Sequence, residues 1–456
     1  MSRKRLSLGI GVFALDKVVV SVVQILMVPV LANMWGLTLY GIWTMIMTIP
    51  SFIVLGDFGI VNSAGARMIQ LVAQDDTNGA QTTLNTAWTA TLSIIAVLMG
   101  AIAFALWKLP DGVVPTTTGF GEADSRLTIL LLLAYGLLTI IYRLNATAYR
   151  AVMLYTPSLL CQTVTYLVEN IAVVVLAASG YGPVVAASGL LATRIAATFG
   201  TYLLGLRLVP SLKPGFARAS WKEWQQLWGP ALAASAFGFG LAGYLQGSVM
   251  ILGAVAGAAA IPAFTAVRTL SRLGVQIATL VSLPVAQEFA SAMGKSQVYR
   301  AGRFFGVVLV PATLLSTAGA LGLVVLGVPF VRLWTHGAIV ADQDLIVFMA
   351  ISSFASMFWN PLANLIMVIN RQRAFSYANL AISAVGLLQI YLMAGSQGAT
   401  AAGISFALVD SVTLMVVVLF IWQHWLVLPE FRSGIASSIA EIRRPMAMLR
   451  SLRKGS

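Results

Sequence analysis

Residues 264–287 read FTAVRTLSRLGVQIATLVSLPVAQ, a stretch that is apolar enough to cross a membrane yet carries Arg268 and Arg272. An arginine at the centre of a lone membrane helix costs roughly 2.5–3.5 kcal/mol on insertion scales, so embedded arginines face other helices or water. Thr265 and Gln276 continue the same spacing of three or four residues, which places all four polar side chains on one helical face. The stretch therefore predicts a membrane-spanning helix with a cationic stripe.

The composition of the whole chain agrees with a membrane protein. Of its 456 residues, 59% are hydrophobic and only 9% are charged, and the mean hydropathy is +0.89. A soluble domain carries roughly 25% charged residues. The single cysteine, Cys161, excludes an internal disulfide and a thiolate metal cluster, and the two histidines lie far apart in the sequence. We therefore expect no metal site, no cofactor and no sizeable soluble domain.

Hydrophobic segments long enough to cross a hydrocarbon core of about 30 Å recur along the chain. We predict an all-α, polytopic membrane protein with twelve spans, the first of them a retained span and not a cleaved signal peptide. The predicted spans are 10–34, 39–55, 86–107, 127–143, 159–178, 183–206, 230–254, 262–285, 304–327, 345–368, 375–393 and 402–426.

The basic residues predict the orientation of these spans. With the N-terminus in the cytoplasm, 21 of the 28 lysines and arginines fall on inner segments, 3 fall on outer loops and 4 fall within spans. Cytoplasmic loops of membrane proteins carry such an excess of positive charge. We therefore expect both termini to be cytoplasmic, and the net charge of +13 needs no nucleic-acid partner to explain it.

A shift of 222 residues places the first six spans on the last six, which predicts a parallel internal repeat. Transporters built this way commonly bind substrate near the middle of the membrane, between the two halves. The predicted organisation is a six-helix lobe at 1–206, a cytoplasmic linker at 207–229, a second lobe at 230–426 and a basic tail at 427–456. The spacing of apolar and basic residues in the tail predicts an amphipathic helix on the anionic inner leaflet.

Polar residues within the spans supply the candidate site. Arg272 lies ~15 Å below the outer end of its span at 1.5 Å per residue, near the middle of the membrane. The candidate cavity cations are Arg268, Arg272 and Lys17, and the candidate cavity polar residues are Gln24, Gln276, Asn360 and Asn364. The candidate ion-coupling carboxylates are Asp16, Glu169 and Asp410.

Each of these groups also has a structural interpretation. Glu169 and Arg194 lie at equal depth on adjacent spans, which favours an ion pair, and embedded amides often bond neighbouring helices. Asp16 and Lys17 point about 100° apart and need not pair. Four embedded bases (Lys17, Arg194, Arg268 and Arg272) against three acids leave too few carboxylates to neutralise every cation. The imbalance predicts a cationic cavity for an anionic substrate, and arginine donates paired hydrogen bonds to phosphate.

The second span and its exit read LYGIWTMIMTIPSFIVLGDFGIVNSAGARMIQ, with Tyr40-Gly41-Ile42-Trp43 at its start. This segment resembles the polysaccharide-transporter branch of the multidrug/oligosaccharidyl-lipid/polysaccharide (MOP) flippase superfamily. The resemblance is specific over about residues 39–75 and looser over 207–300. Three residues of the motif, Asp57, Asn62 and Arg67, are assigned to a cytoplasmic gate.

The resemblance implies a bacterial inner-membrane flippase with two six-helix lobes, V-shaped around a central cavity, similar to multidrug and toxin extrusion (MATE) transporters. The implied substrate is an undecaprenyl-pyrophosphate-linked oligosaccharide for O-antigen (lipopolysaccharide), capsule or exopolysaccharide assembly. The implied partners are membrane lipids, a polysaccharide polymerase and a chain-length regulator. The implied substrate cations are Lys17, Arg268 and Arg272.

Two alternatives remain open. A MATE-like drug or cation antiporter predicts an acid-rich cavity, which the arginines disfavour. A membrane enzyme of glycan assembly, such as a polymerase or ligase, predicts large outer loops and an embedded catalytic cluster. The sequence has neither, so we expect a transporter with no catalytic residues.

Overall fold

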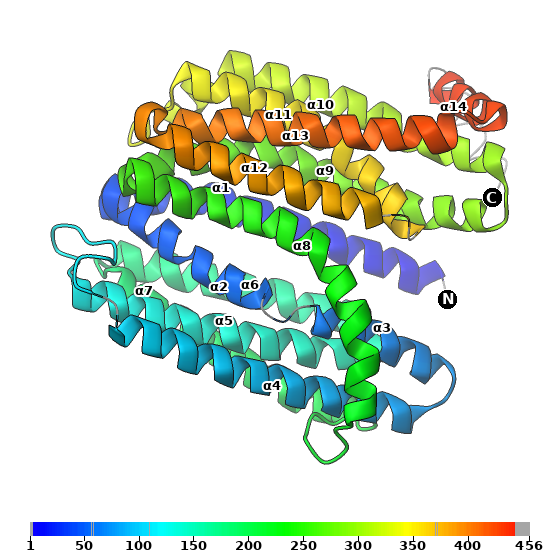
Figure 1. The fold of residues 1–456 in the computed structure, drawn as a ribbon, viewed down its shortest axis with the longest axis horizontal. Coiled ribbons are helices and arrows are strands. Elements are labelled where there is room, and N and C mark those ends of the chain that lie inside the picture. The colour runs from blue at the N-terminus through cyan, green and yellow to red at the C-terminus, as the bar shows by residue number, and fades with distance from the viewer. Residues whose placement is uncertain are drawn as a thin grey trace. The chain divides into compact units, whose positions relative to one another are not determined.

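A computed structural model of the protein describes residues 3–442 apart from positions 56, 58, 109, 370 and 372. Over these residues the chain is built from helices and contains no strand (Figure 1). The helices of the first half are α1 (Arg3–Ile46), α2 (Thr48–Leu55), α3 (Ile60–Ala73), α4 (Thr77–Lys108), α5 (Glu122–Ala151), α6 (Tyr155–Ala178) and α7 (Pro183–Leu208). The second half holds α8 (Trp221–Ala256), η1 (Ala258–Ala260), α9 (Ile261–Gly294), α10 (Val298–Trp334), α11 (Gln343–Val368), α12 (Arg373–Gln397), α13 (Ala399–Ile421), η2 (Trp422–Leu426) and α14 (Pro429–Ile442).

Ten of the twelve predicted spans each fall within one helix, while 39–55 crosses the break at Met47 between α1 and α2, and 402–426 runs from α13 into η2. Ten described segments are long and apolar enough to cross a membrane, and one of them, Gly11–Leu55, contains two predicted spans. The helix α9, which is 34 residues long, contains the quoted cationic stretch. The prediction of an all-α, polytopic membrane protein is therefore confirmed.

The chain divides into two compact units, unit 1 (Met1–Pro262) and unit 2 (Ala263–Ser456). In unit 1, α7 packs against α5 and α6, α1 packs against α6, and α3 packs against α4 and α5. The helix α8 contacts α2, α3 and α4 of the same unit. The lobe bounds drawn from the sequence place the membrane part of α8 in the second lobe, and those bounds stay a prediction.

In unit 2, α11 lies between α10 and α13, and α12 packs on α13. The contacts of α11 and α12 with α13 repeat those of α5 and α6 with α7 in unit 1, as the 222-residue offset predicts. The turns between the first two spans of each half agree as well. Gly36 has φ 73° and ψ 167°, and Gly257 has φ 87° and ψ 155°, a conformation that only glycine adopts without strain.

The Tyr40-Gly41-Ile42-Trp43 motif forms the point where α1 packs on η1. Tyr40, Ile42 and Trp43 are buried, and Trp43 meets Trp35 edge to face at 5.3 Å between ring centroids. A Cβ atom on Gly41 would lie 1.9 Å from the carbonyl oxygen of Ala258. The motif glycine therefore permits a close backbone contact within unit 1.

The predicted basic tail is seen in part. Its first portion folds as α14, which packs on α10 so closely that a Cβ on Gly302 would lie 2.2 Å from the Phe431 carbonyl oxygen. Arg303 of α10 also pairs with Glu441 at 2.6 Å between side-chain atoms. Residues 443–456, which hold most of the predicted basic charge, lie outside the described part of the chain. The contact of the tail with a lipid surface stays a prediction.

Candidate functional site

The helix α9 divides into three faces that fix where its arginines lie. Ser271, Ala278 and Ser282 are buried, and the Ser353 hydroxyl of α11 donates to the Ser271 carbonyl at 3.0 Å. At 3.6 residues per turn, Arg272 stands about 100° around the helix from Ser271. The exposed Ile277 lies on a third face. The cationic stripe is therefore neither the face that packs on α11 nor the exposed apolar face.

The α9–α11 contact is close at two further points. A Cβ atom on Gly274 would lie 2.2 Å from the methyl carbon of Met357 on α11. The Asn364 amide of α11 donates to the Ser282 hydroxyl at 3.3 Å. Of the predicted cavity polar residues, Asn364 therefore joins two helices, while Gln276 and Asn360 are half-buried.

Arg272 has an electrostatic partner in its own unit. Asp410 of α13 is buried, and its carboxylate accepts hydrogen bonds from the Ser352 hydroxyl at 2.5 Å and the Trp359 indole at 3.1 Å. The charge of Arg272 acts on this carboxylate. Within the described residues Arg272 forms no direct hydrogen bond or ion pair. The attraction thus acts between groups that are not directly bonded.

Arg268 lies one turn nearer the start of α9 and meets an aromatic ring. Its guanidinium carbon is 5.0 Å from the centroid of the Phe264 ring, a cation–π distance. Phe264 in turn packs edge to face on Phe406 of α13, with 5.3 Å between centroids. The two arginines therefore have different surroundings although they share a face.

Asp16 and Lys17 of α1 pair with each other. The Lys17 ammonium lies 3.1 Å from one Asp16 oxygen, and Thr163 of α6 donates to the other at 2.8 Å. The sequence left it open whether these neighbours pair, and they do, because the long lysine side chain spans the 100° between them. The ammonium also lies 5.1 Å from the Phe13 ring centroid, while Gln24 is half-buried further along α1.

Glu169 of α6 and Arg194 of α7 form the ion pair that their equal depth predicts. The two side chains are buried, with 2.7 Å between the Arg194 nitrogen and the Glu169 oxygen. Tyr135 of α5 joins the pair through its hydroxyl, 2.9 Å from Arg194 and 3.1 Å from Glu169. This cluster ties three helices of unit 1 together.

These contacts change the charge balance expected of the spans. Lys17, Arg194 and Arg272 each have a carboxylate in contact or in electrostatic range within their own unit. The four embedded cations exceed the three embedded carboxylates by one charge. The sequence predicts that the acids are too few to neutralise every cation. Each of the three acids nevertheless interacts with one of the cations.

The motif after the second span lies at the start of α3 in unit 1. The Asp57 carboxylate accepts the Gly59 N–H at 2.7 Å and lies 3.3 Å from Arg143 of α5. Gly59 has φ 72° and is the N-cap residue that precedes α3. Burial raises the pKa of Asp57, although Arg143 and the Gly59 N–H oppose the shift. Asn62 is exposed on the same helix.

Arg67 of α3 binds a residue that sequence reasoning did not single out. It makes two hydrogen bonds to Glu223 of α8 and one to Gln226, and Thr83 of α4 also donates to Glu223. Burial alone would raise the pKa of Glu223, but these hydrogen bonds and the Arg67 charge lower it below 4.5. Glu223 lies in the first turn of a helix that follows a polar linker. Acidic residues are common there because they stabilise the N-terminus of a helix, so nothing in the sequence indicates a further role.

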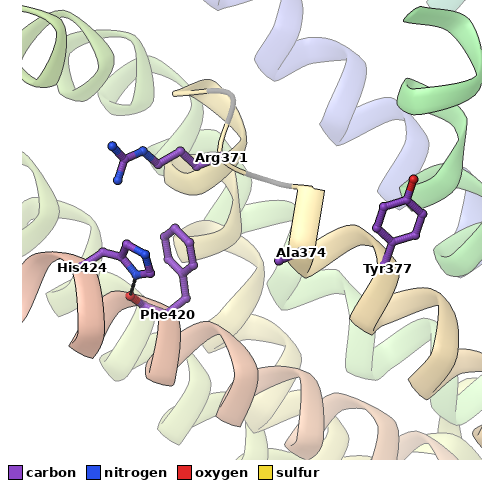
Figure 2. Close-up of a pocket in the computed structure, with 5 residues that line it drawn as sticks. All are labelled: Arg371, Ala374, Tyr377, Phe420 and His424. Atoms are coloured by element: carbon purple, nitrogen blue, oxygen red, sulfur yellow. Dashed lines mark hydrogen bonds between the residues drawn. The ribbon is translucent and has the colours of Figure 1, made fainter. Parts of the chain in front are cut away.

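A second feature missed from the sequence is an open pocket of about 630 Å³ in unit 2. It lies at the start of α12 and the end of α13, and Figure 2 shows the five residues that line it, Arg371, Ala374, Tyr377, Phe420 and His424. None of the predicted site residues lines it. Among the described residues, no group of His, Cys, Asp and Glu side chains could hold a metal ion.

This helix order and packing can be compared with known proteins. An inward-facing multidrug-resistance MATE family transporter of the MOP superfamily aligns with 92% of this chain and 99% of its own, at 15% identity and a TM-score of 0.66. The lipid II flippase MurJ, in an inward closed conformation, aligns over 94% and 90% at 11% identity and a TM-score of 0.68. The fold is that of MOP superfamily transporters.

A third structure is a MOP superfamily transporter from Pyrococcus furiosus described as having a binding pocket of reversed polarity. It aligns over 95% of both chains, at 12% identity and a TM-score of 0.60. No family model and no curated protein matches the sequence of this chain. At such low identity these neighbours establish the fold alone.

Proposed function

We propose that the protein is a flippase that moves an undecaprenyl-pyrophosphate-linked oligosaccharide across the bacterial inner membrane by alternating access. One observation carries the proposal: Arg268 and Arg272 stand one turn apart in the span α9, and Arg272 makes no direct bond to a carboxylate among the described residues. A permanent charge inside a membrane span needs a function or a partner. Asp410 and Arg272 interact without a direct bond, so an anionic head group can become the directly bonded partner of Arg272 during transport.

The guanidinium group suits a pyrophosphate head group better than an ammonium does. Its planar donors can form two parallel hydrogen bonds with phosphate oxygens, and it stays charged at physiological pH. Lys17, by contrast, is bound to Asp16, so it takes a smaller part in substrate binding. Arg272 is the residue that we expect to contact the head group most strongly, with Arg268 one turn away.

The distribution of basic residues supports loading from the cytoplasmic leaflet, with both termini inside. The fold shared with a lipid II flippase is compatible with a lipid-linked cargo. A polysaccharide polymerase and a chain-length regulator would receive the product on the far side of the membrane. Arg67 and Glu223 would close the cytoplasmic end of unit 1.

The test is transport of a fluorescent undecaprenyl-pyrophosphate oligosaccharide in proteoliposomes, read as the fraction that becomes accessible to a membrane-impermeant quencher. Removing one charged phosphate contact costs roughly 1.5–3 kcal/mol, so Arg272→Ala should slow transport at least tenfold. Arg272→Lys should retain an intermediate rate because it keeps the charge but loses the paired donors. Arg332→Ala, which removes an exposed arginine at the end of α10, is the control. An unchanged rate in Arg272→Ala contradicts the proposal.

A MATE-like cation antiporter is the second candidate, and the environment of Asp410 favours it. Of the three ion-coupling candidates, Asp16 and Glu169 are in direct ion pairs, whereas Asp410 is buried and bonded to the neutral groups of Ser352 and Trp359. Such a carboxylate could exchange a proton or Na⁺ for a cationic drug. Gradient-driven efflux of a cationic dye that is lost in Asp410→Asn, with no flipping of the lipid-linked oligosaccharide, would select this candidate.

A further inference from the structure

The pocket drawn in Figure 2 is an open hollow in unit 2, and both apolar and polar side chains line it. Ala374, at the start of α12, and the ring of Phe420, at the end of α13, are apolar parts of its lining. Arg371 stands at the connection between α11 and α12, on the side of the pocket where Phe420 and His424 lie. The combination is an apolar surface with a cation at its rim.

The cation of Arg371 is not neutralised by a neighbouring side chain. Arg371 is exposed, and within the described ranges it forms no ion pair with an acidic side chain. By contrast, Arg300, an exposed arginine at the start of α10, lies 3.7 Å from Glu288. An exposed, unpaired guanidinium beside an apolar wall matches a ligand with both a phosphate and a hydrocarbon part.

The ring of His424 is held in a fixed orientation beside this cation. Its Nδ1 lies 3.0 Å from the Phe420 carbonyl oxygen, so Nδ1 carries the proton and donates to that oxygen. The two rings stack with 4.3 Å between centroids. His424 lies in η2, a π-helical turn, and such turns often occur at functional sites.

Neighbouring side chains place the pocket at the level of lipid head groups. The antiparallel helices α12 and α13 respectively begin and end here, so both sides of the pocket belong to one membrane face. Tyr377 and Trp422 are exposed at this level, as aromatic residues are at the edge of a bilayer. Further along the same helices Leu380 and Met415 are exposed, which continues the apolar surface towards the middle of the membrane.

We propose that this pocket binds an acidic phospholipid of the surrounding bilayer. The phosphate lies against Arg371 with the His424 ring beside it, and the first part of an acyl chain covers Ala374 and Phe420. An acidic lipid is preferred over a zwitterionic one because Arg371 is a positive charge without an acidic partner among the described residues. The proposal does not depend on the cargo that the protein transports.

The experiment is native mass spectrometry of the full chain in detergent, with equal amounts of phosphatidylglycerol and phosphatidylcholine added. We expect phosphatidylglycerol to be retained preferentially, and Arg371→Ala to lower the bound fraction roughly fivefold, the effect of one cation near a lipid surface. Ala374→Trp should lower it as well, because the indole fills the pocket while Arg371 stays in place. Arg300→Ala is the matched control, an exposed arginine on the same membrane face, and should change little.

Three results would overturn the proposal. Equal losses in Arg371→Ala and Arg300→Ala would mean that any surface cation holds the lipid. Equal retention of phosphatidylcholine would mean that the charge is irrelevant. Displacement of phosphatidylglycerol by an equimolar amount of undecaprenyl pyrophosphate would assign the pocket to the transported lipid instead. Unchanged helix content and a single symmetrical peak in size-exclusion chromatography establish that each variant is folded.

Discussion

Unit 1 holds its buried carboxylate Glu169 against an arginine, whereas unit 2 holds Asp410 against neutral donors. In unit 1, Arg194 bonds Glu169 at 2.7 Å and Tyr135 completes the cluster. In unit 2, Ser352 and Trp359 bond Asp410, and Arg272 acts on it without a direct bond. The two units share their helix packing. They differ in whether the buried carboxylate forms a direct ion pair with an arginine.

In a buried ion pair such as Arg194–Glu169, each charge is neutralised by its partner within the protein. Removal of one partner leaves the other as a buried, unpaired charge. An arginine that is not directly bonded to its acid can exchange that acid for a ligand at lower cost. The comparison thus favours a structural role for Arg194, and it is compatible with the binding role that we propose for Arg272. Each of the following substitutions tests one side of this contrast.

The largest expected effect is on the closed pair of unit 1. Arg194→Met leaves Glu169 buried without its cation and should lower the free energy of unfolding by about 3–5 kcal/mol. The measurement is the thermal unfolding of the purified protein in detergent, followed by intrinsic fluorescence.

The double variant Arg194→Met/Glu169→Gln controls for the lost volume. Because it removes both charges, it should recover most of the stability that Arg194→Met loses. A double variant as unstable as the single one would show that packing, and not the charge, holds the three helices together.

A smaller effect is expected where α8 is fastened to α3 and α4. Glu223→Gln removes the charge that Arg67 and Thr83 bind and should cost about 1–2 kcal/mol at neutral pH. Glu441→Gln breaks the exposed Arg303–Glu441 pair of unit 2 and should cost less than about 0.5 kcal/mol. Equal losses would remove the distinction between the two pairs.

The pH dependence of this effect has a definite sign. The pKa of Glu223 is lowered in the folded protein, because the hydrogen bonds from Arg67 and Thr83 outweigh burial. Its contribution is therefore present above the ordinary value of 4.5 and is lost as the pH falls through the lowered folded value. The wild type and Glu223→Gln should differ at pH 7, and the difference should shrink as the pH falls below 4.5 in the same unfolding measurement.

Much of this fold could be predicted from the sequence, because hydrophobic length and helical period act locally. The Glu169–Arg194 pair was also accessible, since both residues lie at one depth on helices joined by a short turn. The Lys17–Asp16 bond was not, because it depends on a side-chain rotamer. Glu223 and the Arg371 pocket were missed for a different reason. Both depend on which helix ends meet in space, and a hydropathy pattern does not contain that information.

The last prediction concerns ligand binding and Asp410, the carboxylate that competes for Arg272. Asp410→Asn keeps the size of the side chain and its neighbours Ser352 and Trp359 but removes the negative charge. If Arg272 binds an anionic head group, the loss of its competing acid should tighten the binding of undecaprenyl pyrophosphate by roughly fivefold, or about 1 kcal/mol. Titration calorimetry of wild type, Asp410→Asn and Arg272→Ala measures this directly. Weaker binding in Asp410→Asn would mean that the acid orients Arg272 for the ligand, and the contrast between the two units would then be one of position and not of charge.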